Sequence, residues 1–453
     1  MASSKSQQFF HTSGATDSVW VHQDPVSNRP SFSKLNQDIE TEVCVIGAGI
    51  GGISTAYELV TRGREVVLLE ARQVLSGETG RTSGHLTNDL DDGYTEIAKK
   101  HGDEGARAAA ESHAWGRDRV GEISKLLGIE CEYRKLPAYE VSQYSTKEAK
   151  EHEDEMNDLR KEEAAQRKFG IDARFDESLT VRGWDGAIDQ RGGLIVKDQA
   201  TFHPTKYLNG ILKWLKTQPN FRCFDETRVM SVEEKGIEIL GIGNKSVNVS
   251  TADGYTVKCS NAVEATCVPL QKLSVIAQME FMRSYCIAAR VPKGAIEDCD
   301  GLTHGVLAGR LIADEIDGIK NPWADVYSPK RIVSMLKSLP SMISHDVQIN
   351  AQYKRFLQSD ITDIEDLGRG MGEAGSKPIA VYKDEEGNVK QYSALCPHMK
   401  GVVCWNTTEK SFDCPVHGSR FSREGICVMG PSKGNLDPVD EAGKADQENV
   451  AGS

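Results

Sequence analysis

Two short clusters of cysteine and histidine near the C-terminus are the residues of this chain best suited to chemistry. One residue separates Cys396 from His398, and two residues separate Cys414 from His417, with fifteen residues between the two clusters. Two thiolates on one iron and two imidazoles on the other hold a [2Fe–2S] cluster of higher reduction potential than an all-cysteine cluster. Two cysteines and two histidines are also a common zinc set. The spacing therefore predicts a metal centre, and electron transfer if the metal is iron.

The residues around the four candidate ligands favour iron over zinc. A proline follows each cysteine, at Pro397 and Pro415, and Gly418-Ser419 follows the second histidine. In this context the segment resembles the cluster loops of Rieske proteins, in which such a Gly-Ser pair closes the second loop. The resemblance implies a [2Fe–2S] cluster held by the four residues named above.

The same resemblance predicts a low reduction potential. High-potential Rieske proteins of respiratory complexes carry a disulfide between their cluster loops, and a serine and a tyrosine hydroxyl donate hydrogen bonds to sulfur. In this chain the disulfide positions are Gly401 and Val416, Ser419 keeps the serine and Phe421 replaces the tyrosine. Each hydrogen bond to sulfur stabilises the more negative, reduced cluster. We therefore expect a potential near the low end of the range from about −150 to +300 mV.

A glycine-rich turn near the start of the chain predicts a second cofactor. It lies between an apolar strand-like segment at 43–46 and a helical segment at 54–61, and a second apolar segment at 66–70 ends in Glu70. Small residues let the backbone approach a pyrophosphate at a helix N-terminus, and the acid is placed to bind ribose hydroxyls. A lone glycine motif is weak evidence, but here strand, turn, helix, strand and acid follow in order. The glycines of the turn are Gly47, Gly49, Gly51 and Gly52.

Later segments indicate which dinucleotide binds. Residues 77–85 resemble the second flavin-contacting loop of the D-amino-acid-oxidase-like (DAO) superfamily, and Val229 lies in a segment that resembles its adenine-side strand. Thr266 matches the A-T-G element, although Cys267 replaces the glycine, and 301–309 resembles the helix whose N-terminus favours negative charge on the reduced flavin. For His85, His304 and Arg81, packing or a surface ion pair is the alternative to a cofactor role. The resemblance implies FAD, with further contacts from Ala71, Arg72, Thr79, Gly80, Arg81, Thr82, Ser83, Gly84, His85, Gly301, Thr303, His304 and Gly305.

With the Rieske segment behind it, the chain resembles fusions of a DAO-type flavoprotein to a Rieske domain. We expect an α/β plus all-β protein: a Rossmann-like FAD-binding domain of DAO type with a shortened antiparallel substrate sheet, then a small antiparallel β Rieske domain. The predicted parts are a polar N-terminal arm with little structure of its own (1–39), the FAD-dependent oxidoreductase domain (40–328), a helical linker (329–357), the Rieske domain (358–432) and a disordered tail (433–453).

The substrate region departs from the superfamily pattern. Members usually have a much longer stretch between the A-T-G strand and the last flavin helix than residues 267–300 provide here. A shortened splice form or gene model explains this more simply than a reduced domain with another role. The function predicted from the resemblance is an oxidoreductase in which flavin oxidises a small C–N or C–O substrate and the cluster relays single electrons. The alternative is a non-catalytic Rieske electron carrier with an inert flavin domain.

Composition narrows the partners. At 453 residues, with 39% hydrophobic and 27% charged residues, the chain reads as a soluble protein of two or three domains. A net charge of −13 argues against nucleic acid or an anionic membrane surface, and no apolar run approaches the ~20 residues of a membrane helix. Eleven scattered cysteines and no visible targeting segment predict reduced thiols in the cytoplasm. A small-molecule substrate and an unidentified electron donor or acceptor are the expected partners, and no catalytic residue can be assigned.

Overall fold

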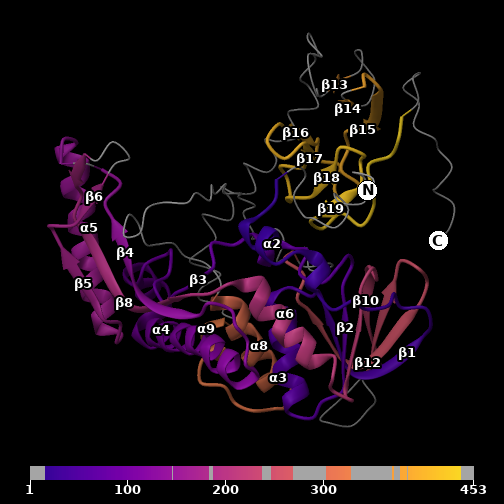
Figure 1. The fold of residues 1–453 in the computed structure, drawn as a ribbon, viewed down its shortest axis with the longest axis horizontal. Helices are drawn as coiled ribbons and strands as arrows, with labels where there is room; N and C mark the ends of the chain where they lie inside the picture. Colours follow the sequence, from indigo (N-terminus) through magenta and orange to yellow (C-terminus); the bar gives the residue numbers. More distant parts are fainter. Residues whose placement is uncertain are drawn as a thin grey trace.

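A computed structural model describes residues 16–144, 146–182, 187–236, 246–268, 303–327, 370–371, 378–384 and 386–439. The predicted linker at 329–357, most of the short segment at 267–300 and Gly301 lie outside the described residues. The described residues form an α/β part near the N-terminus and a small all-β part near the C-terminus (Figure 1). The predicted fold class is confirmed.

A six-stranded sheet in the order β10-β11-β12-β1-β2-β9 forms the centre of the N-terminal part. The strands β12, β1, β2 and β9 run parallel, whereas β10, β11 and β12 are antiparallel. All four residues of β2 are buried, as expected for a parallel strand covered on both faces. The strands are β1 (Ile39–Ile46), β2 (Val66–Leu69), β9 (Phe221–Phe224), β10 (Val229–Lys235), β11 (Ser246–Thr251) and β12 (Thr256–Glu264).

A second, antiparallel sheet is formed by β3, β8 and β4, with β5 also paired to β8. Strand-like segments around 228–240, 246–252, 255–259 and 281–290 suggest an antiparallel sheet within an inserted region. The first three are antiparallel to one another as expected, but they extend the central sheet, because β12 also pairs with β1, and 281–290 lies outside the described residues. The second sheet comes from earlier residues. Its strands are β3 (His85–Leu86), β4 (Arg134–Val141), β5 (Ala173–Asp176) and β8 (Gly193–Thr201), next to the hairpin β6 (Thr180–Arg182) and β7 (Ile188–Gln190).

Helices pack between and around these sheets (Figure 1). Their bounds are α3 (Ile50–Thr61), α4 (Tyr94–Leu127), α5 (Ala149–Lys168), α6 (Pro204–Leu215), α8 (Thr303–Ile316) and α9 (Ala324–Tyr327). The helices α3 and α8 approach so closely that a Cβ added to Gly309 would lie 2.7 Å from the Ser54 carbonyl carbon.

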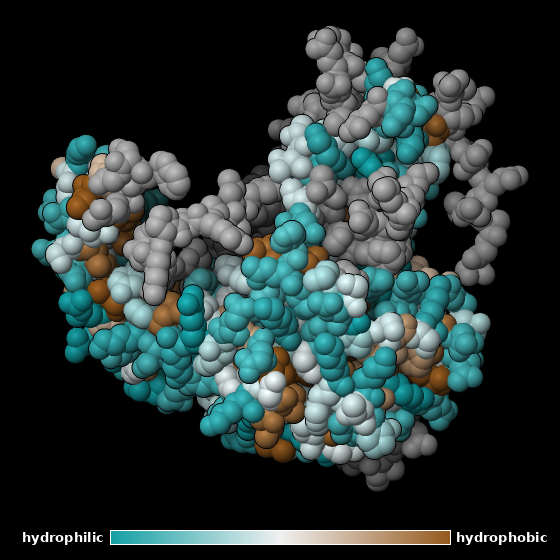
Figure 2. Space-filling model, in the orientation of Figure 1, coloured by the Kyte–Doolittle hydropathy of each residue, from teal (hydrophilic) through white to brown (hydrophobic). Residues whose placement is uncertain are grey.

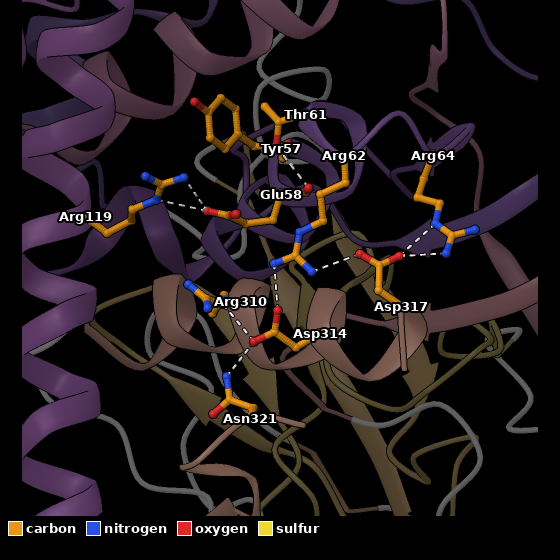
Figure 3. A network of polar contacts seen from close by, with 10 residues as sticks. All are labelled: Tyr57, Glu58, Thr61, Arg62, Arg64, Arg119, Arg310, Asp314, Asp317 and Asn321. Atoms are coloured by element: carbon orange, nitrogen blue, oxygen red, sulfur yellow. Dashed lines mark hydrogen bonds and ion pairs between the residues drawn. The ribbon is translucent and has the colours of Figure 1, made fainter. Parts of the chain in front are cut away.

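Ion pairs fasten the C-terminal ends of α3 and α8 to each other (Figure 3). Asp314, only 1% exposed, accepts hydrogen bonds from Arg62 at 2.8 Å, Arg310 at 2.7 Å and Asn321 at 2.6 Å. Asp317 pairs with Arg62 at 3.0 Å as well. The network therefore fixes the end of α8 that lies away from its N-terminal turn.

The N-terminal arm has more structure than the sequence predicts. Helix α2 (Val19–Gln23) begins at the N-cap Ser18, and a 3-10 turn, η1 (Val26–Asn28), follows. Leu35 is 2% exposed, and its backbone N–H donates to the Thr227 hydroxyl at 3.0 Å. Hydrogen bonds to neighbouring loops hold much of the arm in place. Such bonds leave no apolar periodicity in the sequence, so the pattern of the arm does not indicate its structure.

The C-terminal part consists of two small antiparallel sheets. Two strand-like runs, 379–382 and 389–395, flank a polar turn at 384–388 and predict a hairpin; β14 and β15 pair antiparallel as that pattern predicts. The predicted tail begins too early, since Leu436 is 2% exposed and the Ser393 N–H donates to the Asp437 carbonyl at 2.7 Å. The strands are β13 (Gly370–Met371), β14 (Pro378–Lys383), β15 (Val389–Ser393), β16 (Cys404–Asn406), β17 (Ser411–Asp413), β18 (Arg420–Ser422) and β19 (Cys427–Met429).

The face of the molecule seen in Figure 2 is mostly hydrophilic, in keeping with the charged composition. Within the part of the chain that the structure describes, no helix combines the length and the apolar character needed to cross a membrane.

Candidate dinucleotide site and metal centre

The glycine-rich turn lies between β1 and α3, at the carboxyl edge of the parallel strands, where α/β sheets bind dinucleotides. Gly47 has a φ of 105°, and a Cβ there would lie 2.5 Å from the Ala265 carbonyl oxygen. A Cβ on Gly52 would lie 1.9 Å from the Gly47 oxygen, so neither position accepts a side chain. Around Gly51, by contrast, there is nothing within 4 Å of an added Cβ. The turn is tight on its inner side and open at Gly51, as a backbone cradle for a pyrophosphate requires.

The predicted ribose acid lies against this turn. One carboxylate oxygen of Glu70 accepts the Ala48 N–H at 2.9 Å, and the other accepts the Arg72 N–H at 3.0 Å. Ala71 lies between Glu70 and Arg72, just after the end of β2. The structure thus brings the turn and the acid together.

The predicted flavin loop also reaches the start of α3. The Thr79 hydroxyl accepts the Ile50 N–H at 3.1 Å, which ties the 3-10 turn η2 (Glu78–Arg81) to the helix N-terminus. A Cβ on Gly49 would lie 3.1 Å from the same hydroxyl. The loop and the glycine turn therefore form one surface.

The far side of this loop is held by the N-terminal arm, which the sequence did not predict. Ser18 donates to the Gly80 carbonyl, and Trp20 Nε1 donates to the Thr82 carbonyl at 2.5 Å. The Arg81 guanidinium donates to the Thr16 carbonyl at 3.2 Å, so it points toward the arm. The short apolar run Val19-Trp20-Val21 in the arm is the sequence signal that could have indicated this contact.

The end of the loop passes into the second sheet. Gly84 has a φ of 83°, and a Cβ there would lie 2.7 Å from the Trp20 ring. Its backbone N–H is 3.4 Å from the Thr82 hydroxyl, with Ser83 between them. His85 pairs with Thr201 across β3 and β8, and burial, assisted by Arg134, lowers its pKa to about 4. His85 is therefore neutral near pH 7.

The remaining predicted contacts surround the same edge. Val229 begins β10 and is 5% exposed. The Ala265 N–H donates to the Ile46 carbonyl at 2.8 Å, which places Thr266 beside the glycine turn. Thr303, His304 and Gly305 form the first turn of α8.

The four candidate metal ligands come from two loops of the C-terminal part. Cys396 and His398 lie between β15 and β16, and Cys414 and His417 lie between β17 and β18. The two cysteines are 1% and 3% exposed and hydrogen-bond through their sulfurs, and the two imidazole rings are 4.9 Å apart between centroids. The structure therefore pairs the two sulfurs with each other and the two imidazoles with each other. Among the described residues, no three His, Cys, Asp or Glu side chains are grouped so as to hold a single metal ion.

The chemistry of these side chains fits a [2Fe–2S] cluster. The Cys414 thiol donates a hydrogen bond to Cys396, and this bond has the largest influence on the pKa of Cys396, which it lowers. Burial raises that pKa, whereas hydrogen bonds from the His398 N–H and the Ser419 hydroxyl lower it further, so that the pKa of Cys396 is about 7. A lowered pKa favours the thiolate form, which binds iron, at Cys396. The hydrogen bond between the two cysteines, together with burial, raises the pKa of Cys414, so the two sulfurs hold one proton between them. Burial, with Lys433 nearby, lowers the pKa of His398, which keeps the imidazole neutral. Its Nδ1 is buried without a hydrogen-bond partner, as expected of an atom that binds a metal.

The positions predicted to tune the cluster lie beside the candidate ligands. A Cβ on Gly401 would lie 2.5 Å from Val416 Cγ2 and 3.0 Å from Cys414 Sγ, so residues 401 and 416 face each other without cysteines. The Ser419 hydroxyl accepts the Ser432 N–H at 3.1 Å and hydrogen-bonds Cys396. Phe421 is fully buried and has no hydroxyl to donate.

Comparisons with known proteins agree with both predicted cofactors. The model of the FAD dependent oxidoreductase (DAO) family matches residues 42–294, more than half of the chain. The chain belongs to this family. A Rieske [2Fe-2S] domain model matches residues 358–440. The protein is therefore an oxidoreductase with FAD and a [2Fe–2S] cluster as its cofactors.

Individual relatives cover different parts of the chain. The Rieske 2Fe-2S iron-sulfur protein YhfW of Bacillus subtilis is 24% identical over 91% of this chain and 96% of its own length. Gamma-glutamylputrescine oxidoreductase of Escherichia coli is 36% identical over 23% of this chain and 24% of its own length. The crystal structure of glycine oxidase from Geobacillus kaustophilus is similar with a TM-score of 0.39 and 15% identity, over 50% of this chain and 55% of the other.

Proposed function

We propose that this oxidoreductase oxidises a C–N bond of a small amine or amino acid and sends the electrons out singly through its cluster. The resemblance at the sequence level left C–N and C–O substrates open. The relative named for an amine substrate, gamma-glutamylputrescine oxidoreductase, supports the C–N bond.

The observation that carries the proposal is the presence, in one chain, of a dinucleotide cradle and a pair of cluster loops, in two parts of the structure that contact each other. The Lys433 ammonium, close to the cluster loops, donates to the Met230 carbonyl beside the nucleotide edge at 2.6 Å. FAD takes two electrons from a substrate, whereas a [2Fe–2S] cluster carries one at a time. In the proposed reaction the substrate loses two electrons and two protons to become an imine, and an outside acceptor takes the electrons.

The test is anaerobic mixing of purified protein with a panel of amines and amino acids. We expect one compound class to bleach the flavin absorbance and then to produce the EPR signal of the reduced cluster. In the Cys414→Ser variant, the same compound should still bleach the flavin, but no cluster signal should appear. If dithionite reduces the cluster while no compound bleaches the flavin, the chain is an electron carrier with an inert flavin domain.

A further inference from the structure

The C-terminal Rieske domain makes side-chain contacts with the FAD-binding part, and we call this set of contacts the domain junction. Arg72 donates to the Val428 carbonyl, and Arg228 lies 3.5 Å from the Cys427 carbonyl oxygen. In the opposite direction, Lys433 donates to the Met230 carbonyl at 2.6 Å. Strand β19 and the residues that follow it therefore rest on the loops at the ends of β2 and β9.

These loops are also the loops that border the dinucleotide site. The Arg72 N–H donates to the Glu70 carboxylate, whose other oxygen accepts the N–H of Ala48 in the glycine turn. The loop after β9 is joined to the same residues, since the Thr227 N–H donates to the Glu70 carbonyl at 2.8 Å and the Glu226 N–H to the Arg72 carbonyl at 2.7 Å. Arg72 thus contacts Glu70, the predicted ribose-binding acid, through its backbone N–H, and it takes part in the domain junction through its side chain.

A second set of contacts joins the Rieske domain to the FAD-binding part through the N-terminal arm, and we call these the arm contacts. The Thr16 hydroxyl donates to Glu409 of the Rieske domain, with distances of 2.8 and 2.9 Å to the two carboxylate oxygens. The Thr16 carbonyl accepts from Arg81, and Ser18 donates to the Gly80 carbonyl in the same flavin loop. The domain junction and the arm contacts both end on segments that line the cofactor site.

The charges of the junction suit an anionic cofactor. Arg72, Arg228 and Lys433 are all cations, and their junction contacts are to backbone carbonyls, which do not neutralise a charge. The carboxylates of Glu70 and Glu78 lie near Arg72 and offset its charge in part, whereas Arg228 adds to the positive charge there. The pyrophosphate of FAD is anionic and binds at the neighbouring helix N-terminus. Opposite charges in a partly buried site attract more strongly than in water, so cofactor binding should reduce the cost of bringing these cations together.

We propose that the Rieske domain stabilises the FAD site, so that docking of this domain at the domain junction and binding of FAD strengthen each other. Lys433 and Thr16 act as positioning residues, because each reaches the cofactor site only through other residues. Coupling of this kind is reciprocal: a change on the Rieske side must weaken FAD binding by the factor by which FAD strengthens docking.

The experiment measures the Kd of FAD for full-length apoprotein by flavin fluorescence, in wild type and in the variants Lys433→Met and Thr16→Val. Lys433→Met removes one contact of the domain junction, and Thr16→Val removes the hydrogen bond between the N-terminal arm and Glu409; each keeps the approximate size of the side chain. We expect each to raise the Kd by about fivefold, the low end of typical coupling, because both side chains are partly in water. The control is Lys383→Met, which removes an exposed lysine at the end of β14, and Lys433→Arg should restore much of the affinity.

Cluster content and the EPR spectrum show whether each variant has kept its Rieske fold. A Kd within twofold of wild type in both Lys433→Met and Thr16→Val, with the cluster spectrum intact, would overturn the proposal. An equal loss of affinity in the Lys383→Met control would also overturn it. No substrate is used, so this test and the test of amine oxidation fail independently.

Discussion

The close contact between α3 and α8 gives a prediction in which two opposing effects can be weighed. A Cβ on Gly309 would lie 2.7 Å from the carbonyl carbon of Ser54 and 2.9 Å from the Thr55 nitrogen. These are backbone atoms in the middle of α3, so they cannot rotate away as a side chain would. In Gly309→Ala the two helices must therefore move apart.

The magnitude follows from two terms of opposite sign. Alanine stabilises a helix interior by about 1 kcal/mol relative to glycine. Overpacking a close contact costs about 1–3 kcal/mol, and a contact below 3.0 Å with backbone belongs in the upper half of that range. We expect a net loss of about 1–2 kcal/mol in the free energy of unfolding. For a large domain this lowers Tm by about 2–8 °C.

Thermal unfolding of the apoprotein, followed by circular dichroism, checks this value. The matched control is Gly51→Ala in α3, where an added Cβ has nothing within 4 Å. This control should leave the Tm unchanged or raise it slightly, since only the helix-propensity term remains. The reasoning is refuted if Gly309→Ala unfolds at or above the wild-type temperature.

Two further predictions concern the ion-pair network and the cluster. For Asp314, burial raises the pKa, but hydrogen bonds from Arg310, Asn321 and Arg62 more than offset it, so the pKa is lowered overall. Its contribution is therefore present above the unfolded pKa of about 3.9 and is lost as the pH falls through the lowered folded value. Asp314→Asn should cost about 2–3 kcal/mol at pH 7, and the gap to wild type in urea unfolding should narrow below about pH 4; a constant gap would contradict this. Phe421→Tyr should raise the cluster potential in protein-film voltammetry by about 40–90 mV if the new hydrogen bond favours the reduced state by about 1–2 kcal/mol, since 59 mV corresponds to a tenfold change for one electron. An unchanged or lower potential would refute the tuning argument.

The parts of the fold that the sequence predicts are those with short-range causes. The glycine turn, its flanking strands and Glu70 lie within a short stretch of chain, and each carries a local signal of periodicity or residue type. The cluster loops are similarly compact, and their residue types leave few chemical alternatives. The resemblance identifies Gly401 and Val416 as the two disulfide positions of high-potential Rieske proteins, and the structure places these residues next to each other.

Strand partners far apart in the sequence were harder to predict. The strand β12 has the alternating burial of an antiparallel strand, and it does pair with β11 in that way. Its other edge pairs in parallel with β1, more than two hundred residues earlier, and a strand's residue pattern does not say what lies along its second edge.

The domain junction shows a deeper reason why such contacts escape sequence reasoning. Its acceptors are the backbone carbonyls of Met230, Cys427 and Val428, which any residue type would supply. Only the donors leave a trace in the sequence, and a single Arg or Lys is indistinguishable there from an ordinary surface cation. Residue type will thus be informative on the donor side of the junction and nearly silent on the acceptor side. It follows that substitutions at Met230 or Val428 should be tolerated as long as the backbone keeps its path. Loss of the Lys433 or Arg72 side chain should instead weaken docking of the Rieske domain and raise the Kd of FAD.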